Sequence, residues 1–508
     1  MNRKRLIRIL GTIILVEFAA MLPPLGISMY TRDQSGVRGF LLTLLIMLIL
    51  SGIMLLYSRN AGRKMSTWED VICTGLAPAG SPGTVPLRRT RLGCHWVALS
   101  VLGALPLFLS GQVPDFVDSL FEITSGFTTT GASVISDIEK LGKGVIFWRS
   151  FSHWLGGMGV LAFFLAILPA KGNDNGYAMN LLLSESPGPM VSKIVPRLKE
   201  STEILYMIYI GLTVLDIIFL LIAKMPVFDA FCIAFGTAGT GGFAVLNSGF
   251  ATYTVLAQNV TTVFMILFGI NFSLFYLLLI RRFRNVFRDE EVRLYFGIIF
   301  VSIIVITINM IGKTQDTATL GETVKNVAFT VGSIITTTGF STADFDGWNS
   351  LSKAILFLLM IVGATAGSTG GGLKVSRLLV LYKAHKRTTH NRLYPDEVKV
   401  IKLNGEMLSE RTIVSVESYL VIYFIIIAIS FILVSADPVN YSFETNLSAV
   451  IATFNNIGPG FGKVGPTANF SGYSMFSKIV MTVDMLLGRL EIYPILALFA
   501  FNSLRRKY

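Results

Sequence analysis

Long apolar segments alternate with short basic clusters along this 508-residue chain. The first two segments cover about residues 6–30 and 38–58, and the polar link Thr31-Arg32-Asp33 between them predicts a helical hairpin. Several segments approach or exceed the roughly 20 apolar residues that span a bilayer. The pattern predicts an all-α integral membrane protein with about ten transmembrane helices.

After the hairpin, one plan occurs four times: a long apolar segment, a short one, a polar loop and a second long one. The short segments begin near Pro114, Pro226, Thr319 and Ser442, where proline and acidic residues are helix N-terminal signals. Each is about 10–14 residues long, too short to cross a bilayer but suited to a re-entrant helix. The predicted divisions are an N-terminal hairpin at 1–65, pore repeats at 92–170, 200–285, 286–388 and 411–508, and cytoplasmic connectors at 66–91, 171–199 and 389–410.

The polar loops of the four units have related sequences that end in glycine. They read Thr128-Thr129-Thr130-Gly131, Gly239-Thr240-Gly241-Gly242, Thr336-Thr337-Thr338-Gly339 and Asn455-Asn456-Ile457-Gly458. Non-helical backbone at membrane depth is tolerated only where it is buried in protein or lines a water-filled cavity. The repeat therefore predicts four pseudo-symmetric helix–pore-loop–helix units around one pore, whose loops form an ion filter. The candidate ion-binding residues are Thr129, Thr130, Gly131, Gly241, Gly242, Thr337, Thr338, Gly339, Asn456, Ile457 and Gly458.

The composition of these loops suits a cation. A cation that enters a low-dielectric region must exchange its water shell for oxygen ligands, which backbone carbonyls can supply. Glycine permits the required backbone angles because it has no side chain, and the C-terminal end of each short helix is the negative end of its dipole. No Lys or Arg precedes the glycine in any of the four loops.

Composition and charge support a membrane protein and argue against other classes. The chain is 52% hydrophobic and 15% charged, whereas a soluble domain carries about 25% charged residues. The net charge of +12 arises from basic clusters that the positive-inside rule places in the cytoplasm, with both termini. We therefore expect no nucleic-acid partner. Three scattered cysteines and four scattered histidines suggest no metal site, and we expect no cofactor bound by the chain itself.

A glycine-rich stretch interrupts the second long segment of the third unit. Five glycines with serine and threonine occur between Gly363 and Gly372, where an ordinary helix would run from about 351 to 383. These residues weaken a helix and predict an unwound loop below the filter. The stretch is not a phosphate-binding loop, because Gly372 is followed by Leu373-Lys374. The alternative is a surface for close helix packing.

Several ionisable residues lie inside apolar segments and are functional candidates for that reason. Arg489 lies deep in the last segment, while Glu17 and Asp216 are expected to be interhelical partners. Lys374 and Arg377 are expected to reach the cytoplasmic interface by snorkelling. His153 and Asn271 are expected to form packing hydrogen bonds, with no role in ion binding.

The combined motifs resemble the Trk/Ktr/HKT superfamily of potassium transporters, and the resemblance covers nearly the whole chain. The matching stretches are residues 127–132, 241–243, 335–342, 363–374, 455–460 and Gly488-Arg489-Leu490-Glu491. The N-terminal hairpin resembles TrkH-type subunits rather than the shorter KtrB type. The resemblance implies that Gly131, Gly242, Gly339 and Gly458 are filter glycines, and that glycine at all four positions favours potassium.

The resemblance also implies a gate, partners and a location. The gate would be the intramembrane loop, with Arg489 as a pore-facing cation that pairs with it; its residues are Gly367, Ser368, Thr369, Gly370, Gly371 and Gly372. Homodimers with one pore per protomer are expected in the bacterial inner membrane, among membrane lipid. The connector at 171–199 would contact a cytosolic, TrkA-like, nucleotide-binding regulatory ring. The expected function is potassium uptake.

Two alternatives remain. A sodium- or proton-coupled cation symporter also uses glycine-broken helices, although that class usually shows inverted repeats, whereas these four units all begin and end on the cytoplasmic side. A polytopic membrane enzyme would need a clustered acid, base or metal site. The charged residues lie mainly at the predicted membrane edges, so no enzymatic activity is expected.

Overall fold

The computed structural model describes residues 3–59, 93–157, 159, 198–311, 319–394, 396–397 and 399–492. Within these ranges the chain is almost entirely helical, which confirms the predicted fold class. The predicted connector at 66–91, nearly all of that at 171–199, and the chain after residue 492 lie outside the described residues.

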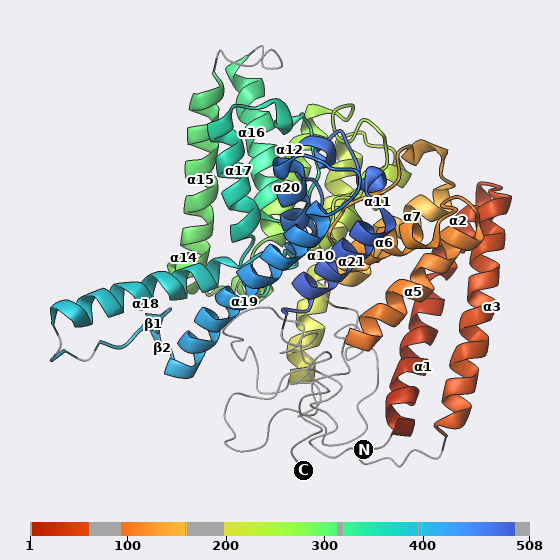
Figure 1. Ribbon diagram of the computed structural model, residues 1–508, viewed down its shortest axis with the longest axis horizontal. Helices are drawn as coiled ribbons and strands as arrows, with labels where there is room; N and C mark the ends of the chain where they lie inside the picture. The colour runs from red at the N-terminus through yellow and green to blue at the C-terminus, as the bar shows by residue number, and fades with distance from the viewer. Residues whose placement is uncertain are drawn as a thin grey trace.

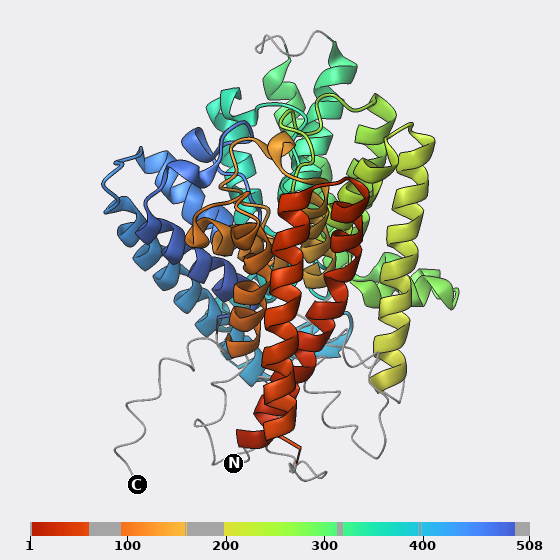
Figure 2. The ribbon, with the colours of Figure 1, turned by 90° about the vertical axis from the view of Figure 1, so that its right-hand side faces the viewer.

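The N-terminal hairpin forms as predicted. Helices α1 (Arg3–Ala20) and α2 (Leu22–Tyr30) pack against the returning helix α3 (Gln34–Tyr57), and Figure 2 shows α1 and α3 side by side. Asp33 begins α3 because its carboxylate accepts a hydrogen bond from the Gly36 N–H at 3.0 Å. Helix α3 in turn packs on α5 of the first repeat, so the hairpin braces one side of the four-repeat body.

Each of the four repeats contains the predicted long helix, short helix and second helix. The long first helices are α5 (Gly93–Leu109), α10 (Leu198–Ile222), α15 (Glu290–Met310) and α19 (Glu410–Ser435). The short helices are α6 (Phe116–Phe127), α11 (Val227–Gly239), α16 (Leu320–Ile335) and α20 (Phe443–Phe454). The second helices begin with α7 (Lys143–Gly157), α12 (Val255–Phe268), α17 (Ser350–Val362) and α21 (Met475–Arg489).

The remaining elements continue or connect these helices. After the second helices of repeats two and three come α13 (Phe272–Leu279), α14 (Phe283–Arg288) and α18 (Val375–Leu393), followed by a two-stranded antiparallel hairpin of β1 (Lys402–Leu403) and β2 (Glu406–Met407). Short 3-10 turns follow the polar loops: η1 (Ile138–Lys140), η2 (Phe345–Gly347), η3 (Gly462–Val464) and η4 (Phe470–Gly472). Helix α18 projects sideways from the body (Figure 1).

The second helices of repeats two and three are interrupted, which leaves fewer described helices long enough to span a membrane alone. Five described helices have the length and apolar character for a crossing, or six if α12 and α13 count as one span bent by 95°. In repeat three, α17 ends at Val362 and α18 begins only at Val375. The predicted spans of repeats two and three are therefore present as two pieces each.

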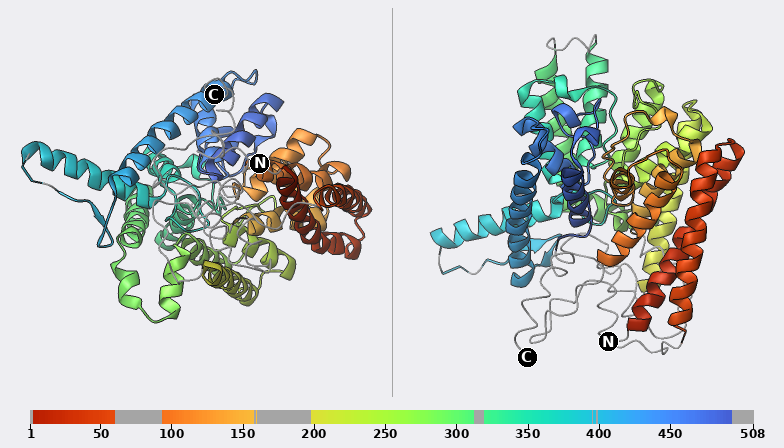
Figure 3. Two further views of the ribbon diagram at one scale, coloured as in Figure 1. Left: turned by 90° about the horizontal axis from the view of Figure 1, so that it is seen from below. Right: turned by 45° about the vertical axis from the view of Figure 1, so that its right-hand side comes forward.

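The four repeats close into a ring. Seen from below, they follow one another in chain order around a common centre (Figure 3). Each second helix packs on the short helix of the next repeat: α7 on α11, α12 on α16, α17 on α20, and α21 back on α6. The short helices are thus held inside the body, with their C-terminal ends close together.

Local sequence fixes where the short helices begin. Asp115, Thr319 and Ser442 each cap the following helix by accepting a backbone N–H, at 2.8, 3.3 and 3.3 Å respectively. Pro226 precedes α11 directly, a position at which its missing N–H costs no intrahelical hydrogen bond. These starts agree with the boundaries predicted from the sequence.

Close packing of the hairpin predicts that alanine substitutions at two glycines of α3 have different effects on the melting temperature. A Cβ on Gly39 would lie 2.6 Å from the Pro106 carbonyl oxygen, whereas a Cβ on Gly52 would meet nothing within 4 Å. We expect Gly39→Ala to lower the melting temperature of the purified protein, since overpacking costs about 1–3 kcal/mol. Gly52→Ala should leave it unchanged or raise it. Equal melting temperatures would contradict this packing.

Candidate functional site

Each short helix ends in the same hydrogen-bonded reversal, the Schellman motif. In the first repeat, the Thr130 N–H donates to the Ser125 carbonyl at 2.8 Å and the Thr129 N–H to the Gly126 carbonyl at 3.0 Å. The bond that spans five residues is repeated in the other three repeats. There, the N–H groups of Gly241, Thr338 and Ile457 donate to the carbonyls of Gly236, Ser333 and Ala452, at 2.8, 2.8 and 2.9 Å. Four loops of different sequence therefore leave their helices along one path.

The backbone angles repeat as closely as the hydrogen bonds. The residue two positions before each filter glycine has a left-handed φ: 55° at Thr129, 54° at Thr240, 58° at Thr337 and 55° at Asn456. Threonine is rarely found in this region because its branched Cβ is crowded there. Such strain persists only where the surrounding structure over-determines the conformation, and here it sits at the predicted filter.

The filter glycines form a closed ring with the carbonyl groups of neighbouring loops. A Cβ built on each glycine would lie closer than 3.0 Å to a carbonyl oxygen of another loop. The pairs are Gly131 with the Gly241 oxygen, Gly242 with that of Thr338, Gly339 with that of Ile457, and Gly458 with that of Thr130. All four glycines have positive φ, from 69° to 102°. Glycine is thus required at each position for two reasons, backbone angle and space.

Side chains support the loops unequally. The hydroxyls of Thr128 and Thr130 lie 2.8 Å apart, and those of Thr336 and Thr338 repeat this contact at 2.8 Å. The Asn456 amide instead donates to the Thr130 hydroxyl of the neighbouring first loop at 2.9 Å. The ring is therefore pseudo-symmetric, as the unequal loop sequences predicted.

A small vestibule opens on one side of the ring. This cavity of about 160 Å³ is lined by Gly131, Gly242, Gly339 and Gly458, and by residues that follow them in each loop. Because every loop contributes its glycine to the floor, the cavity leads to the centre of the ring.

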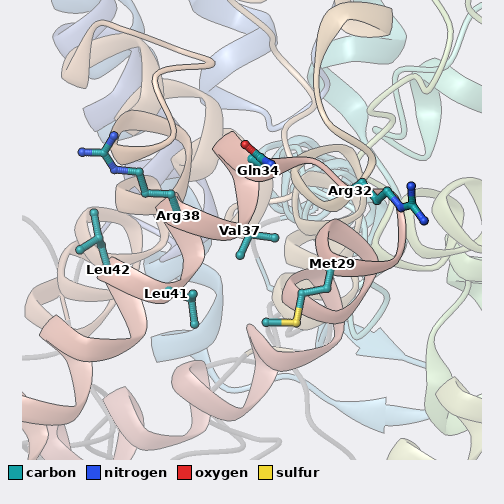
Figure 4. Close-up of a pocket in the computed structure, with 7 residues that line it drawn as sticks. All are labelled: Met29, Arg32, Gln34, Val37, Arg38, Leu41 and Leu42. Atoms are coloured by element: carbon teal, nitrogen blue, oxygen red, sulfur yellow. The ribbon is translucent and has the colours of Figure 1, made fainter.

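A larger hollow elsewhere lacks these features. It measures about 650 Å³ and lies on the N-terminal hairpin (Figure 4). It is lined by Met29, Arg32, Gln34, Val37, Arg38, Leu41 and Leu42. With two arginines, no acidic group and no filter residue, this hollow is not the ion site.

The glycine-rich stretch is unwound, as predicted, and contacts the underside of the filter. The Gly371 N–H donates to the Thr337 hydroxyl at 2.6 Å, and the Gly372 N–H donates to the Asn455 carbonyl at 3.1 Å. A Cβ on Gly370 would lie 2.8 Å from the Thr336 carbonyl oxygen. Residues 363–374 therefore pack directly against the third and fourth filter loops, on the side opposite the vestibule.

This loop is also anchored in the break of the neighbouring repeat. The Gly269 carbonyl, between α12 and α13, accepts from the Thr365 N–H at 3.2 Å and hydroxyl at 3.0 Å. The Phe272 N–H donates to the Gly367 carbonyl at 3.0 Å. Groups freed by one broken helix are thus satisfied by the other, as non-helical backbone at membrane depth requires.

Arg489 joins three elements beneath the ring. From the end of α21, its Nη1 donates to the Thr369 carbonyl at 2.8 Å and its Nη2 to the Gly157 carbonyl at 2.7 Å. It thus connects the unwound loop to the end of α7. The predicted pairing of Arg489 with this loop is present in the structure.

The prediction for Lys374 and Arg377 was wrong. Their side chains are 2% and 5% exposed, so they do not reach the cytoplasmic interface. The Lys374 ammonium donates to the Gly370 carbonyl, while Arg377 pairs with Glu491 at 2.8 Å and lies over the Tyr419 ring at 4.0 Å. Both residues are drawn inward because the loop folds back instead of continuing as one helix.

Among the other polar residues singled out in the sequence, two form the expected hydrogen bonds and two do not within the described part of the chain. His153 contacts the Gly126 carbonyl through Nδ1 at 2.9 Å, and Asn271 caps α13 by accepting from the Ser273 N–H at 2.9 Å. These packing contacts match expectation. Glu17 and Asp216 are 3% and 0% exposed, yet their carboxyl oxygens have no hydrogen-bond partner among the described residues. The predicted interhelical pairs are therefore not found in this part of the chain.

Sequence reasoning missed a buried ion pair beside the filter. Glu122 of α6 and Arg149 of α7 are 0% and 1% exposed, and Arg149 donates to Glu122 from Nε at 2.8 Å. Both charges lie among apolar residues in the middle of their helices, and that signal marks functional candidates.

Comparison with known proteins agrees with the geometry. Residues 84–505 match the model of the family described as TrkH, cation transport protein. The chain is 31% identical to the Trk system potassium uptake protein TrkH of Salmonella typhimurium, covering 98% of this chain and 99% of that one. It is 29% identical to the Trk system potassium uptake protein TrkG of Escherichia coli strain K12, covering 96% of each.

A solved structure shows the same fold. The crystal structure of the potassium transporter TrkH from Vibrio parahaemolyticus superposes with a TM-score of 0.82 at 27% identity, covering 98% of both chains. The relatives are transporters, and the enzyme alternative is excluded with them. This chain belongs to the TrkH family of cation transport proteins.

Proposed function

We propose that this chain is a potassium-uptake pore of a bacterial inner membrane. The observation that carries the proposal is the closed ring in which the carbonyls of Thr130, Gly241, Thr338 and Ile457 contact the four filter glycines. Carbonyl rings are how proteins replace the hydration shell of potassium. The family and the potassium uptake named for its relatives agree with this reading.

The path of the ion follows from the arrangement. A cation enters the vestibule, loses water, and binds at the ring, towards which the negative ends of the four short helices point. The positive-inside rule orients the vestibule outwards and both termini towards the cytoplasm. Inward movement is driven by the membrane potential, which supplies about 2.3 kcal/mol per charge per 100 mV.

The loop at 363–372 acts as the gate in this proposal. It lies directly under the ring, and Arg489 adds a positive charge where a cation would leave. Opening requires that the contacts of Gly371 with Thr337 and of Arg489 with Thr369 be broken. A homodimer with one pore per protomer would assemble on a cytosolic, TrkA-like, nucleotide-binding ring that contacts the connector at 171–199 and sets the gate.

A sodium- or proton-coupled cation symporter is the second candidate. The specific observation in its favour is the pair of broken helices, α12–α13 and α17–α18, since secondary transporters build ion sites at such breaks. The two breaks here contact each other. The carbonyls of the ring come from the filter loops and not from these breaks. Parallel repeats also favour a pore.

Potassium uptake is tested by complementation. Bacteria that lack their own potassium-uptake systems should grow at low potassium and take up rubidium when they express this chain together with a TrkA-type partner. Absence of rescue with and without the partner, despite membrane expression, would contradict the proposal. Rubidium uptake that depends on external sodium or on a proton gradient at constant membrane potential would favour the symporter.

The filter assignment predicts a selectivity change at Gly131. Gly131→Ser places a Cβ against the Gly241 carbonyl and strains the left-handed backbone, so the ring must widen. We expect the ratio of potassium to sodium permeability to fall on the order of tenfold, or about 1.4 kcal/mol. Gly297→Ser on α15, where a Cβ meets nothing within 4 Å, is the control. An unchanged ratio would remove Gly131 from the filter.

The gate assignment predicts increased flux when the loop is shortened. Deleting Ser368–Gly370 removes the carbonyls that Arg489 and Lys374 bind. Rubidium uptake per folded protein should rise and lose its dependence on the regulatory partner. Arg489→Gln, whose amide still donates hydrogen bonds but carries no charge, should produce a smaller rise. If flux and regulation are unchanged in both variants, the loop serves only for packing.

A further inference from the structure

The buried residues Glu122 and Arg149 contact other groups in addition to each other. Two charges held out of water are tolerated only when geometry and additional hydrogen bonds compensate their desolvation. Beyond Arg149, the Glu122 carboxylate accepts from the Ser133 hydroxyl and the Val134 N–H, both at 3.0 Å. Ser133 and Val134 are the second and third residues after filter Gly131. Glu122 therefore ties the short helix α6 to the chain that leaves the first filter loop.

The fourth repeat makes the same type of clamp without a charge. There, the Ser448 hydroxyl of α20 accepts from the Phe461 N–H at 2.9 Å, and Phe461 is the third residue after filter Gly458. A side chain of the short helix thus holds the same backbone N–H in two repeats. A hydroxyl is sufficient for that task, so the carboxylate in repeat one has a further reason to be there.

Arg149 provides that reason, because it reaches the second filter loop and the vestibule. Its guanidinium lies over the Phe243 ring at 4.2 Å, and Phe243 directly follows filter Gly242. The arginine also lines the vestibule from which a cation would approach the ring. A positive charge at this place repels cations unless an equal negative charge lies beside it.

We propose that Glu122 and Arg149 are a specificity-determining pair that positions the first two filter loops. Glu122 clamps the chain after Gly131, and Arg149 stacks on the residue after Gly242. Their charges cancel, so the vestibule gains a rigid bridge between two loops without a net field against potassium. The inference rests on the proposed potassium pore.

Two variants separate the electrostatic part from the geometric part. Glu122→Gln keeps the shape but leaves the Arg149 charge unbalanced, so the KM for rubidium should rise on the order of tenfold and selectivity over sodium should fall. Glu122→Gln with Arg149→Met removes both charges and the bridge. Its KM should return to within about threefold of the wild type, while its selectivity remains low.

Controls distinguish these effects from a loss of folding. Glu410→Gln breaks the exposed Arg387–Glu410 pair between α18 and α19 and should change neither KM nor selectivity. Membrane abundance and melting temperature are measured for every variant. If Glu122→Gln does not accumulate, Arg149→Lys carries the test, since lysine keeps the charge but loses the planar fork and its stacking. It should lower selectivity with a KM near that of the wild type.

Three outcomes would overturn the proposal. Wild-type KM and selectivity in Glu122→Gln or Arg149→Lys, at normal abundance, would leave the pair without a role in the filter. A double variant whose KM is as high as that of Glu122→Gln would refute the charge balance. Loss of folded protein in all of these variants would assign the pair to folding alone. Absence of rubidium uptake by the wild type would instead contradict the proposed function.

Discussion

The close approach of four carbonyl oxygens to four glycines is the constraint on which the rest of the structure depends. Each filter glycine leaves no room for a Cβ because the carbonyl of another loop occupies that place. The loops can meet so closely only if all four short helices end at one depth and reverse in the same way. The left-handed threonines Thr129, Thr240 and Thr337 show that this requirement overrides local backbone preference.

The helices around the ring are arranged to hold those four ends together. Each second helix packs on the short helix of the next repeat, and the last one packs on the short helix of the first repeat, so the four repeats form a closed ring. Two of these helices, α12 and α17, break beneath the filter. Their freed backbone groups bind each other, the filter loops and Arg489. In the proposed pore, selection and gating share this hydrogen-bonded layer, so movement of the loop is coupled to the shape of the ring.

The order of the helices and loops could largely be predicted from the sequence, because it depends on local signals. Apolar length, the caps at Asp115, Thr319 and Ser442, and the four glycine-ended loops predicted the repeats and their order. Five glycines predicted the unwound stretch. Local signals could not show that Lys374 and Arg377 turn inward, because that follows from the path of the loop after it leaves α17. The partners of Glu122 and Arg149 were also hidden, since they lie on different helices and contact two filter loops.

The proposed pore requires one cation site within the ring of carbonyls. Anomalous diffraction from crystals grown in rubidium, collected at the rubidium absorption edge, tests it most directly. A peak is expected on the pore axis, bounded by the carbonyl oxygens of Thr130, Gly241, Thr338 and Ile457. An empty ring, with rubidium bound instead beside a buried carboxylate such as Asp216 or at the α12–α13 break, would contradict it.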